Sequence, residues 1–210
     1  MKRAYLPVLF LVIFSLIGCG SRTIKYNATL SDLRCSSSRS VAVAVLDERP
    51  YVLKKQKEPN YVGLMRGGYG NPFDMWTESG APLADDMLST IADSLSAKGF
   101  AVTPVKTSAA DSMNSVLTKL KDSRAERLLL IDMKEWYSDY LPEAFAAERS
   151  TLFVNLEVTV FDRNQKKLAK YNLNEVLDLP SGWPYDTIPN IYQNKISKMI
   201  DDSRICGALK

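Results

Sequence analysis

The stretch Val41-Ala42-Val43-Ala44-Val45-Leu46 decides the fold that we expect for this chain of 210 residues. Both of its faces are apolar, and a β-branched residue occupies every other position. This composition is typical of a strand buried on both faces within a sheet. The polar run Asp47–Pro50 follows and ends it. The sequence therefore predicts a sheet built around this strand.

Two amphipathic helices are expected downstream, separated by a short strand over Phe100–Val105. In the first helix, Pro82 suits the first turn, and Asp85 and Asp86 suit the positive end of the helix dipole. Its apolar stripe consists of Leu83, Met87, Leu88, Ile91 and Leu95. The second helix follows Ser108 and has the stripe Met113, Val116, Leu117 and Leu120. Such stripes indicate helices that each pack one face against a core.

Three strands and a closing helix are predicted in the C-terminal part of the chain. In the first, Arg127–Tyr137, we expect Met133 and Tyr137 on one face and Trp136 on the other. Thr151–Phe161 alternates strictly and, with Leu168–Leu177, indicates a hairpin. The closing helix spans Asp186–Asp202. The element order β-α-β-α-β-β-β-α predicts a single α/β (α+β) domain with a mixed sheet over residues 41–210.

The chain loses its periodicity between residues 48 and 80, where glycines and aromatic residues gather. A loop of this length in a compact domain is either functional or disordered. Its Gly67-Gly68-Tyr69-Gly70 run lacks the lysine of a phosphate loop and is expected to be a flexible loop. Aromatic, methionine and arginine side chains are enriched at interfaces. We therefore place partner binding in Tyr61–Trp76, with the contact residues Arg66, Tyr69, Phe73 and Trp76. A disordered or self-packed loop is the alternative.

The N-terminus has the pattern of an export signal. Met1–Arg3 is positively charged, and Ala4–Ile17 is apolar but short for a membrane-spanning helix. Leu16-Ile17-Gly18-Cys19 resembles the lipobox of bacterial lipoproteins. That resemblance implies cleavage before Cys19, a diacylglycerol on its thiol and an acylated N-terminus. Gly20, rather than aspartate, follows the cysteine and implies sorting to the outer membrane, on its periplasmic face. An ordinary signal peptide, or a single membrane anchor, is the alternative.

These assignments divide the chain into a signal peptide over residues 1–18, a lipid anchor and tether over residues 19–40, and the α/β domain. The tether contains an alternating piece, Ile24 to Leu30, which is able to pair as an edge strand. Acylation of Cys19 leaves an even pair, Cys35 and Cys206, in an exported protein. We predict that this pair forms a disulfide between the two ends of the domain, the alternative being two free thiols.

Composition excludes several functions. Loss of Lys2 and Arg3 with the signal lowers the formal charge from +3 to about +1, which leaves no electrostatic footprint for nucleic acid. The chain has no histidine, which excludes histidine-dependent triads and the usual zinc sites. The adjacent carboxylates Asp47-Glu48 and Asp85-Asp86 are expected to be solvated or to complement helix dipoles rather than to catalyse. No cofactor, metal or catalytic residue is predicted.

A resemblance covers roughly residues 83–202. The helix end Ser96–Phe100, the strand running into Trp136–Tyr140, the hairpin and the helix end Met199–Asp202 resemble the YajG-like family of bacterial lipoproteins. More distantly, the element order is similar to the TolB N-terminal domain and to lipoprotein activators of peptidoglycan synthases, which implies binding of other envelope proteins. The insertion at residues 48–80 departs from the family. Trp136, Tyr137 and Tyr140 either stack a sugar or peptide or cover the edge of the core.

These observations predict a noncatalytic outer-membrane lipoprotein whose periplasmic domain binds another cell-envelope component, most simply an envelope protein. Binding of peptidoglycan or a small ligand through residues 61–76 is the alternative, and a periplasmic enzyme is a weaker one. A partner-binding surface is flat and apolar, whereas a ligand site is concave with convergent polar groups.

Overall fold

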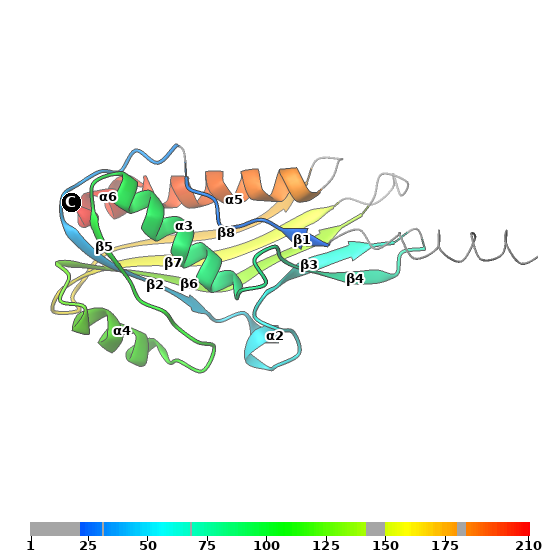
Figure 1. Ribbon diagram of the computed structural model, residues 1–210, viewed down its shortest axis with the longest axis horizontal. Helices are drawn as coiled ribbons and strands as arrows, with labels where there is room; N and C mark the ends of the chain where they lie inside the picture. The colour runs from blue at the N-terminus through cyan, green and yellow to red at the C-terminus, as the bar shows by residue number, and fades with distance from the viewer. Residues whose placement is uncertain (1–21, 31, 68, 142–149, 180–183) are drawn as a thin grey trace, which may run out of the picture.

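A computed structural model describes residues 22–30, 32–67, 69–141, 150–179 and 184–210 of the chain (Figure 1). Cys19 and Gly20 lie outside the described residues. The described strands are β1 (Thr23–Ile24), β2 (Ser40–Asp47), β3 (Tyr61–Arg66), β4 (Pro72–Thr77), β5 (Ala101–Pro104), β6 (Arg127–Tyr140), β7 (Thr151–Asp162) and β8 (Lys167–Asp178). The described helices are α2 (Pro50–Leu53), α3 (Leu83–Ala97), α4 (Met113–Asp122), α5 (Pro184–Ile200) and α6 (Ser203–Leu209).

All of these strands belong to one curled, mixed sheet that is organised around β6. The first half of β6 pairs in parallel with β2, and its last residues pair in parallel with β3. Along its other edge β6 pairs antiparallel with β7, and β7 pairs with β8. Beyond β2 lies β5, whereas β4 and then β1 lie beyond β3. The predicted strand Val41–Leu46 is buried and has a neighbour on each side, as expected.

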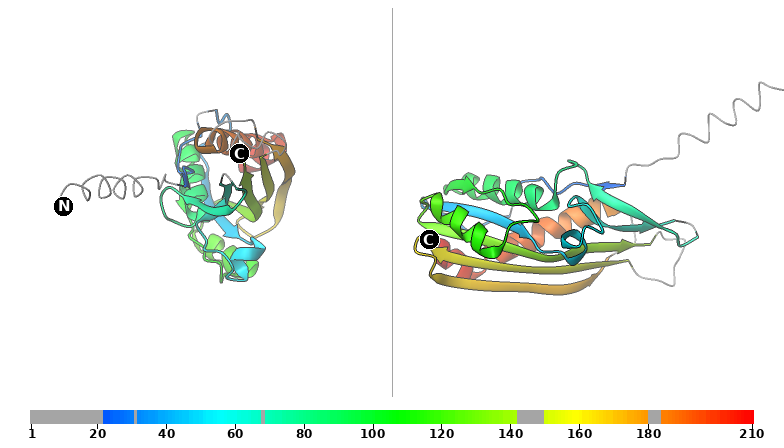
Figure 2. Two further views of the ribbon diagram at one scale, coloured as in Figure 1. Left: turned by 90° about the vertical axis from the view of Figure 1, so that its right-hand side faces the viewer. Right: turned by 90° about the horizontal axis from the view of Figure 1, so that it is seen from below.

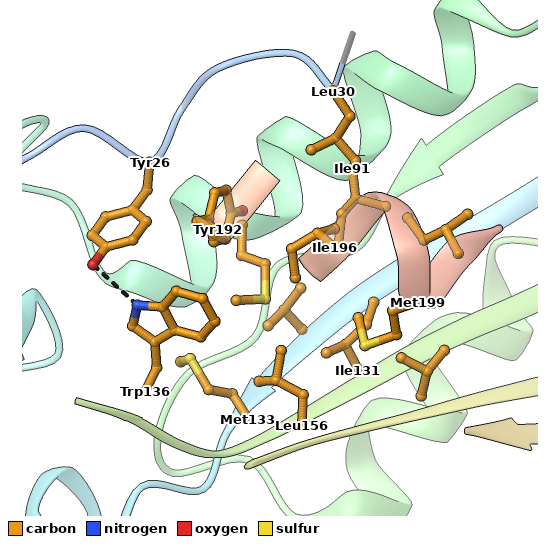
Figure 3. Packing of buried hydrophobic residues seen from close by; sticks show 14 of the residues in the cluster. Tyr26, Leu30, Ile91, Ile131, Met133, Trp136, Leu156, Tyr192, Ile196 and Met199 are labelled. Carbon is orange, nitrogen blue, oxygen red and sulfur yellow. Dashed lines mark hydrogen bonds between the residues drawn. The ribbon is translucent and has the colours of Figure 1, made fainter. Parts of the chain in front are cut away.

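Helices cover the two faces of the sheet unequally. On one face α3, α5 and α6 pack with the N-terminal segment to enclose the main core, which includes Trp136, Tyr192 and Met199 (Figure 3). On the other face α4 covers a smaller cluster that includes Leu128, Leu130 and Val116. From that side no described helix lies in front of β7 and β8, while α4 and α2 lie nearer β2 (Figure 2, right). Much of one face of the sheet is therefore bare.

The predicted order β-α-β-α-β-β-β-α corresponds to β2, α3, β5, α4, β6, β7, β8 and α5 and is confirmed. The prediction of an irregular stretch over residues 48–80 is wrong. These residues form α2 and the hairpin β3–β4, whose strands join the sheet. Gly63 and a register shift between Tyr61 and Gly63 interrupt the alternation that would have revealed β3. Gly63 has a φ of +148°, and a Cβ there would lie 2.2 Å from the carbonyl oxygen of Ser138, so only glycine fits.

A buried ion pair holds the start of this stretch. Arg49 is fully buried and makes two hydrogen bonds to Asp47, of 2.8 and 2.7 Å. It also donates to the carbonyl oxygens of Tyr61 and Pro59, at 2.5 and 2.7 Å. Burial alone would lower the pKa of Arg49, but hydrogen bonding and the charge of Asp47 raise it. Asp47 is thus neither solvated nor available as a catalytic acid, and Arg49 ties the end of β2 to the start of β3.

The faces predicted for the end of β6 are also wrong. The register with β7 shifts between Met133 and Glu135, so one extra residue reverses the alternation. Trp136 consequently points to the same side as Met133 and is fully buried in the main core, whereas Tyr137 points to the bare face. Tyr140 is buried as well. Of the two interpretations of Trp136 and Tyr140, the structure shows the one in which they belong to the core.

The N-terminal segment is bound to the domain from Arg22 onward. Thr23 and Ile24 pair with Trp76 and Thr77, so an edge strand forms, although it is short. Further along, Tyr26, Leu30 and Leu33 are buried in the main core. Residues 22–30 and 32–39, which we expected to be a tether, thus lie on the folded domain.

The structure contains the predicted disulfide between Cys35 and Cys206, with a Cα–Cα distance of 5.6 Å. The carboxylate of Asp201 reinforces it by accepting hydrogen bonds from the backbone N–H groups of Arg34 and Cys35, at 3.0 and 2.7 Å. Among the described residues, no helix combines the length and apolar character needed to cross a membrane.

Candidate binding face

An aromatic row crosses the bare face of the sheet. Tyr61 of β3 lies opposite Trp76 of β4, and Tyr137 of β6 lies opposite Phe153 of β7. Ring centroids are 6.0 Å apart for Tyr61–Trp76, 6.3 Å for Tyr61–Tyr137 and 5.7 Å for Tyr137–Phe153. Val176 of β8, opposite Phe153, extends the row and is 64% exposed. We call these five residues the aromatic row.

The rings of the row form a sloping platform. Tyr61 and Tyr137 are inclined to one another by 35°, and Tyr137 and Phe153 by 38°, so these three rings are tilted in steps, whereas Trp76 meets Tyr61 edge to face at 75°. Tyr61 is nearly buried, whereas Tyr137, Phe153 and Trp76 are partly exposed. Burial raises the pKa of Tyr61 and of Tyr137, with nearby carboxylates adding to the effect. Their hydroxyls therefore remain protonated at physiological pH, able to donate and to accept hydrogen bonds.

A cleft of about 280 Å³ opens beside the row, between α2 and β6. Its lining consists of Tyr51, Gln56, Lys57, Tyr61, Glu135 and Tyr137. The hydroxyl of Tyr51 donates a 2.7 Å hydrogen bond to Glu135, and burial raises the pKa of that hydroxyl. The ammonium group of Lys57 lies 4.6 Å from the ring centroid of Tyr61 and 2.6 Å from the Asp74 carboxylate. Aromatic surface and charged groups thus meet at this cleft.

A polar row lies next to the aromatic row. Glu135, Asn155 and Asn174 occupy directly opposed positions on β6, β7 and β8. They line a second cleft of about 530 Å³, which shares Glu135 with the first cleft and Phe153 and Val176 with the aromatic row. Within the described part of the chain, the side-chain amides of Asn155 and Asn174 take part in no hydrogen bond. Each amide therefore offers a donor and an acceptor to a ligand.

A third, ionic row borders the second cleft, which Lys134 lines. Glu157 lies opposite Asp132 and accepts from Lys134 and Lys170 at 2.9 and 2.7 Å. Burial alone would raise the pKa of Glu157, but the two lysines lower it. For Asp132, burial and then the charges of Glu48 and Glu157 raise the pKa to about 7. Its Oδ1 is buried and has no hydrogen-bond partner among the described residues.

The structure separates the four residues that we predicted to form a contact surface. Arg66 makes hydrogen bonds of 2.8 and 2.6 Å to Asp139, at the edge of the bare face. Tyr69 is fully exposed in the turn of the hairpin. Phe73 lies opposite Met65 on the other face of the hairpin, under the guanidinium of Arg22. Of the four, Trp76 alone belongs to the aromatic row, so residues 61–76 do not form one continuous site.

Sequence reasoning missed Phe153, Asn155 and Asn174, and it assigned Tyr137 to the core face. One signal was present: in β7 the outward positions alternate with an apolar series, and Phe153 and Phe161 are the large apolar residues among them. Nothing in the sequence indicated that Tyr61 and Tyr137 would be neighbours, because they lie 76 positions apart in the chain.

The other carboxylate pair that we singled out also has a structural role. Asp86 is buried and accepts a 2.8 Å hydrogen bond from Ser79, while burial raises the pKa of its carboxyl group. Asp85 lies 3.7 Å from Lys106 in a largely exposed ion pair. Within the described ranges, no three histidine, cysteine, aspartate or glutamate side chains are grouped so as to hold a metal ion.

The chain is thus a mixed α/β domain with a bare, aromatic face. No family model matches the sequence, and no curated protein matches it. Protein XCC0632 from Xanthomonas campestris is similar in structure, with 14% identity, 90% of both chains covered and a TM-score of 0.44. Lipoprotein GNA1162 from Neisseria meningitidis has 18% identity over 79% of this chain and 99% of that chain, with a TM-score of 0.46. The PelC dodecamer from Paraburkholderia phytofirmans has 12% identity over 85% and 93%, with a TM-score of 0.44.

At these identities and scores the similar structures add no residue to the candidate face. The resemblances to the YajG-like family and to the TolB domain stay predictions.

Proposed function

We propose that this protein is a lipid-anchored, noncatalytic protein of the outer membrane whose periplasmic domain binds another envelope component through its bare face. The observation that carries this proposal is the aromatic row. Four rings from four strands lie in one continuous line, and helices α4 and α2 leave much of the face that carries them uncovered. Large aromatic side chains in such a position favour association, because each provides much contact area and a polar edge.

The anchor rests on the sequence. The lipobox at Leu16–Cys19 makes Cys19 the proposed lipidation site, and Gly20 favours the outer membrane. The Cys35–Cys206 disulfide agrees with an oxidising compartment such as the periplasm. Two or more acyl chains would hold the protein on the membrane without a spanning helix.

The proposal that the protein is noncatalytic rests on the surroundings of its buried carboxylates. Asp47 is neutralised by Arg49, and Asp86 is hydrogen-bonded by Ser79. Asp132, which has the pKa best suited to proton transfer, is buried beneath the ionic row rather than placed in either cleft. A binding role therefore needs fewer assumptions than an enzymatic one.

The partner is tested by photo-crosslinking in living cells. A benzophenone amino acid at position 153 should capture the partner, whereas the same residue at position 114, exposed on α4, should not. In a second strain, Tyr137→Ala should weaken that capture while Asn114→Ala leaves it unchanged, with a loss of about 1 to 3 kcal/mol in binding. Equal capture from positions 153 and 114 would refute the binding face.

A second candidate function, glycan binding, is favoured by the polar row. A sugar presents an apolar C–H face able to stack on Tyr137 or Phe153, and hydroxyl groups suited to the amides of Asn155 and Asn174. Sedimentation with purified peptidoglycan sacculi tests this candidate. Asn155→Ala with Asn174→Ala should reduce sedimentation if a glycan is the ligand. If the wild-type chain does not sediment with sacculi but still crosslinks to a protein, glycan binding is rejected.

A further inference from the structure

The hairpin β3–β4 lies beside the point where the chain leaves toward the proposed anchor. The Trp76 backbone N–H donates a 3.0 Å hydrogen bond to the carbonyl oxygen of Arg22, and the guanidinium carbon of Arg22 lies 4.2 Å from the ring centroid of Phe73. Only three peptide units separate Arg22 from Cys19. Because a residue spans at most about 3.6 Å, the Cα atoms of Cys19 and Arg22 lie within about 11 Å of each other.

The direction of β1 sets which end of the domain is nearest to that anchor. β1 runs parallel to β4, with Thr23 opposite Trp76 and Ile24 opposite Thr77. β4 itself starts at Pro72, next to the turn of the hairpin, and runs away from it. The described chain therefore begins, at Arg22, on the side of β1 that faces the hairpin turn (Figure 1). Since Cys19 is bonded to Arg22 through only three peptide units, the anchor is tied to this end of the domain.

The turn carries a side chain suited to a lipid surface. Tyr69 is fully exposed, and the turn that presents it is closed by hydrogen bonds from Gly67 to Asn71 and from Gly70 to Gly67, each 2.8 Å. Tyrosine is enriched where a bilayer meets water, because its ring is apolar and its hydroxyl bonds to headgroups. A fully exposed ring next to a lipidated residue has the bilayer within its reach.

We propose that the turn around Tyr69 rests on the phospholipid headgroups of the leaflet that holds the anchor, with Tyr69 inserted among them. The inference rests on the lipidation of Cys19 in the proposed function. It fixes the orientation of the domain: the strands stand away from the membrane, and the bare face, with its aromatic row, looks sideways along the membrane surface. The protein would then bind its partner close to the membrane surface.

The test uses the full lipidated protein in vesicles of phosphatidylethanolamine and phosphatidylglycerol. A nitroxide is attached to Asn71→Cys, with Tyr69 retained, and in a matched sample to Leu168→Cys at the far end of β8. Collisions with a water-soluble nickel complex are measured by electron paramagnetic resonance. We expect them to be several-fold rarer at position 71 than at position 168. We also expect Tyr69→Ser to remove most of that protection.

Two results would overturn the inference. Equal accessibility at positions 71 and 168 would show that the turn faces water. If Tyr69→Ser leaves the protection unchanged, the short chain after Cys19, rather than the tyrosine, holds the turn at the membrane. Mass spectrometry of the same sample separates these failures from a failure of the proposed function, because a protein without lipid on Cys19 would refute the anchor itself.

Discussion

The indole nitrogen of Trp136 donates a 3.0 Å hydrogen bond to the hydroxyl oxygen of Tyr26, 110 positions earlier in the chain (Figure 3). Both side chains are fully buried, and their rings meet edge to face at 6.1 Å. Tyr192 of α5 completes the cluster, 5.1 Å from Tyr26 and 5.5 Å from Trp136. The N-terminal segment, the sheet and the last long helix are therefore joined at one point.

Tyr26→Phe should reduce the free energy of unfolding by about 1 to 3 kcal/mol, because the buried indole N–H loses its acceptor. Tyr192→Phe is the matched control, since the Tyr192 hydroxyl is buried without a hydrogen-bond partner among the described residues. Chemical denaturation monitored by circular dichroism measures both variants. Equal stability losses for the two would show that the hydrogen bond contributes nothing beyond packing.

Arg49→Met should destabilise the protein by about 3 to 5 kcal/mol, because it leaves Asp47 buried without a countercharge. The double variant Asp47→Asn with Arg49→Met should recover part of that loss. Arg34→Met removes an ion pair to Asp201 whose arginine is 86% exposed, and should change stability by less than about 1 kcal/mol. A small effect of Arg49→Met would mean that water reaches Asp47.

Because of Asp132, the free energy of unfolding should fall as the pH rises from about 4 to about 7. Its folded-state pKa, about 7, exceeds the unfolded value near 3.9, so the folded protein binds the proton more tightly. Its contribution is greatest below pH 4 and is lost as the pH rises through 7. Asp132→Asn should remove this dependence and stabilise the protein at pH 8 by on the order of 2 to 4 kcal/mol.

The control for this pH dependence has the opposite sign. Hydrogen bonds from Lys119 and Ser108 lower the pKa of Asp111, so its contribution is present above pH 4 and is lost on acidification. Asp111→Asn should therefore weaken the protein at neutral pH and leave the decline between pH 4 and 7 in place. Melting temperatures measured across this range compare the two variants, and a decline that survives Asp132→Asn would assign it to another group.

Replacing Cys35 and Cys206 by serine should lower the free energy of unfolding by up to about 5 kcal/mol, since the bond closes a loop of 171 residues. Hydrogen exchange should then show the segment from Arg22 to Cys35 opening before β2 and β6. A reductant applied to the wild-type protein should give the same pattern. Unchanged stability after reduction would indicate that the Asp201 contacts alone hold the segment.

Regular patterns made the long elements predictable. The stripes of α3 and α5 and the alternation of β7 follow directly from burial of one face, and their positions were found. The hairpin β3–β4 was missed because Gly63 and the register shift beside it break the period of two. The same cause, an inserted residue near Lys134, reversed the faces of Trp136 and Tyr137. Local irregularities in pairing are set by the partner strand, which a single sequence does not display.

The candidate face was harder to predict than the core. Its rings come from β4, β3, β6 and β7, and they become neighbours only through pairing between strands far apart in the chain. The sequence did place Tyr61 and Trp76 in a stretch rich in aromatic residues. It gave no reason to join them to Phe153 or to the amides of Asn155 and Asn174.

The attachment of the N-terminal segment determines how a mechanical load would pass through the molecule. Tension from a lipid at Cys19 would first act along β1, parallel to β4, and would shear their backbone hydrogen bonds before reaching the buried Tyr26 and Leu30. At Cys35 the pull would divert through the disulfide into α6 and the C-terminus. Strand β2, five residues further on, would therefore be reached by the pull only after β1 has separated from β4 and the disulfide has taken up the load.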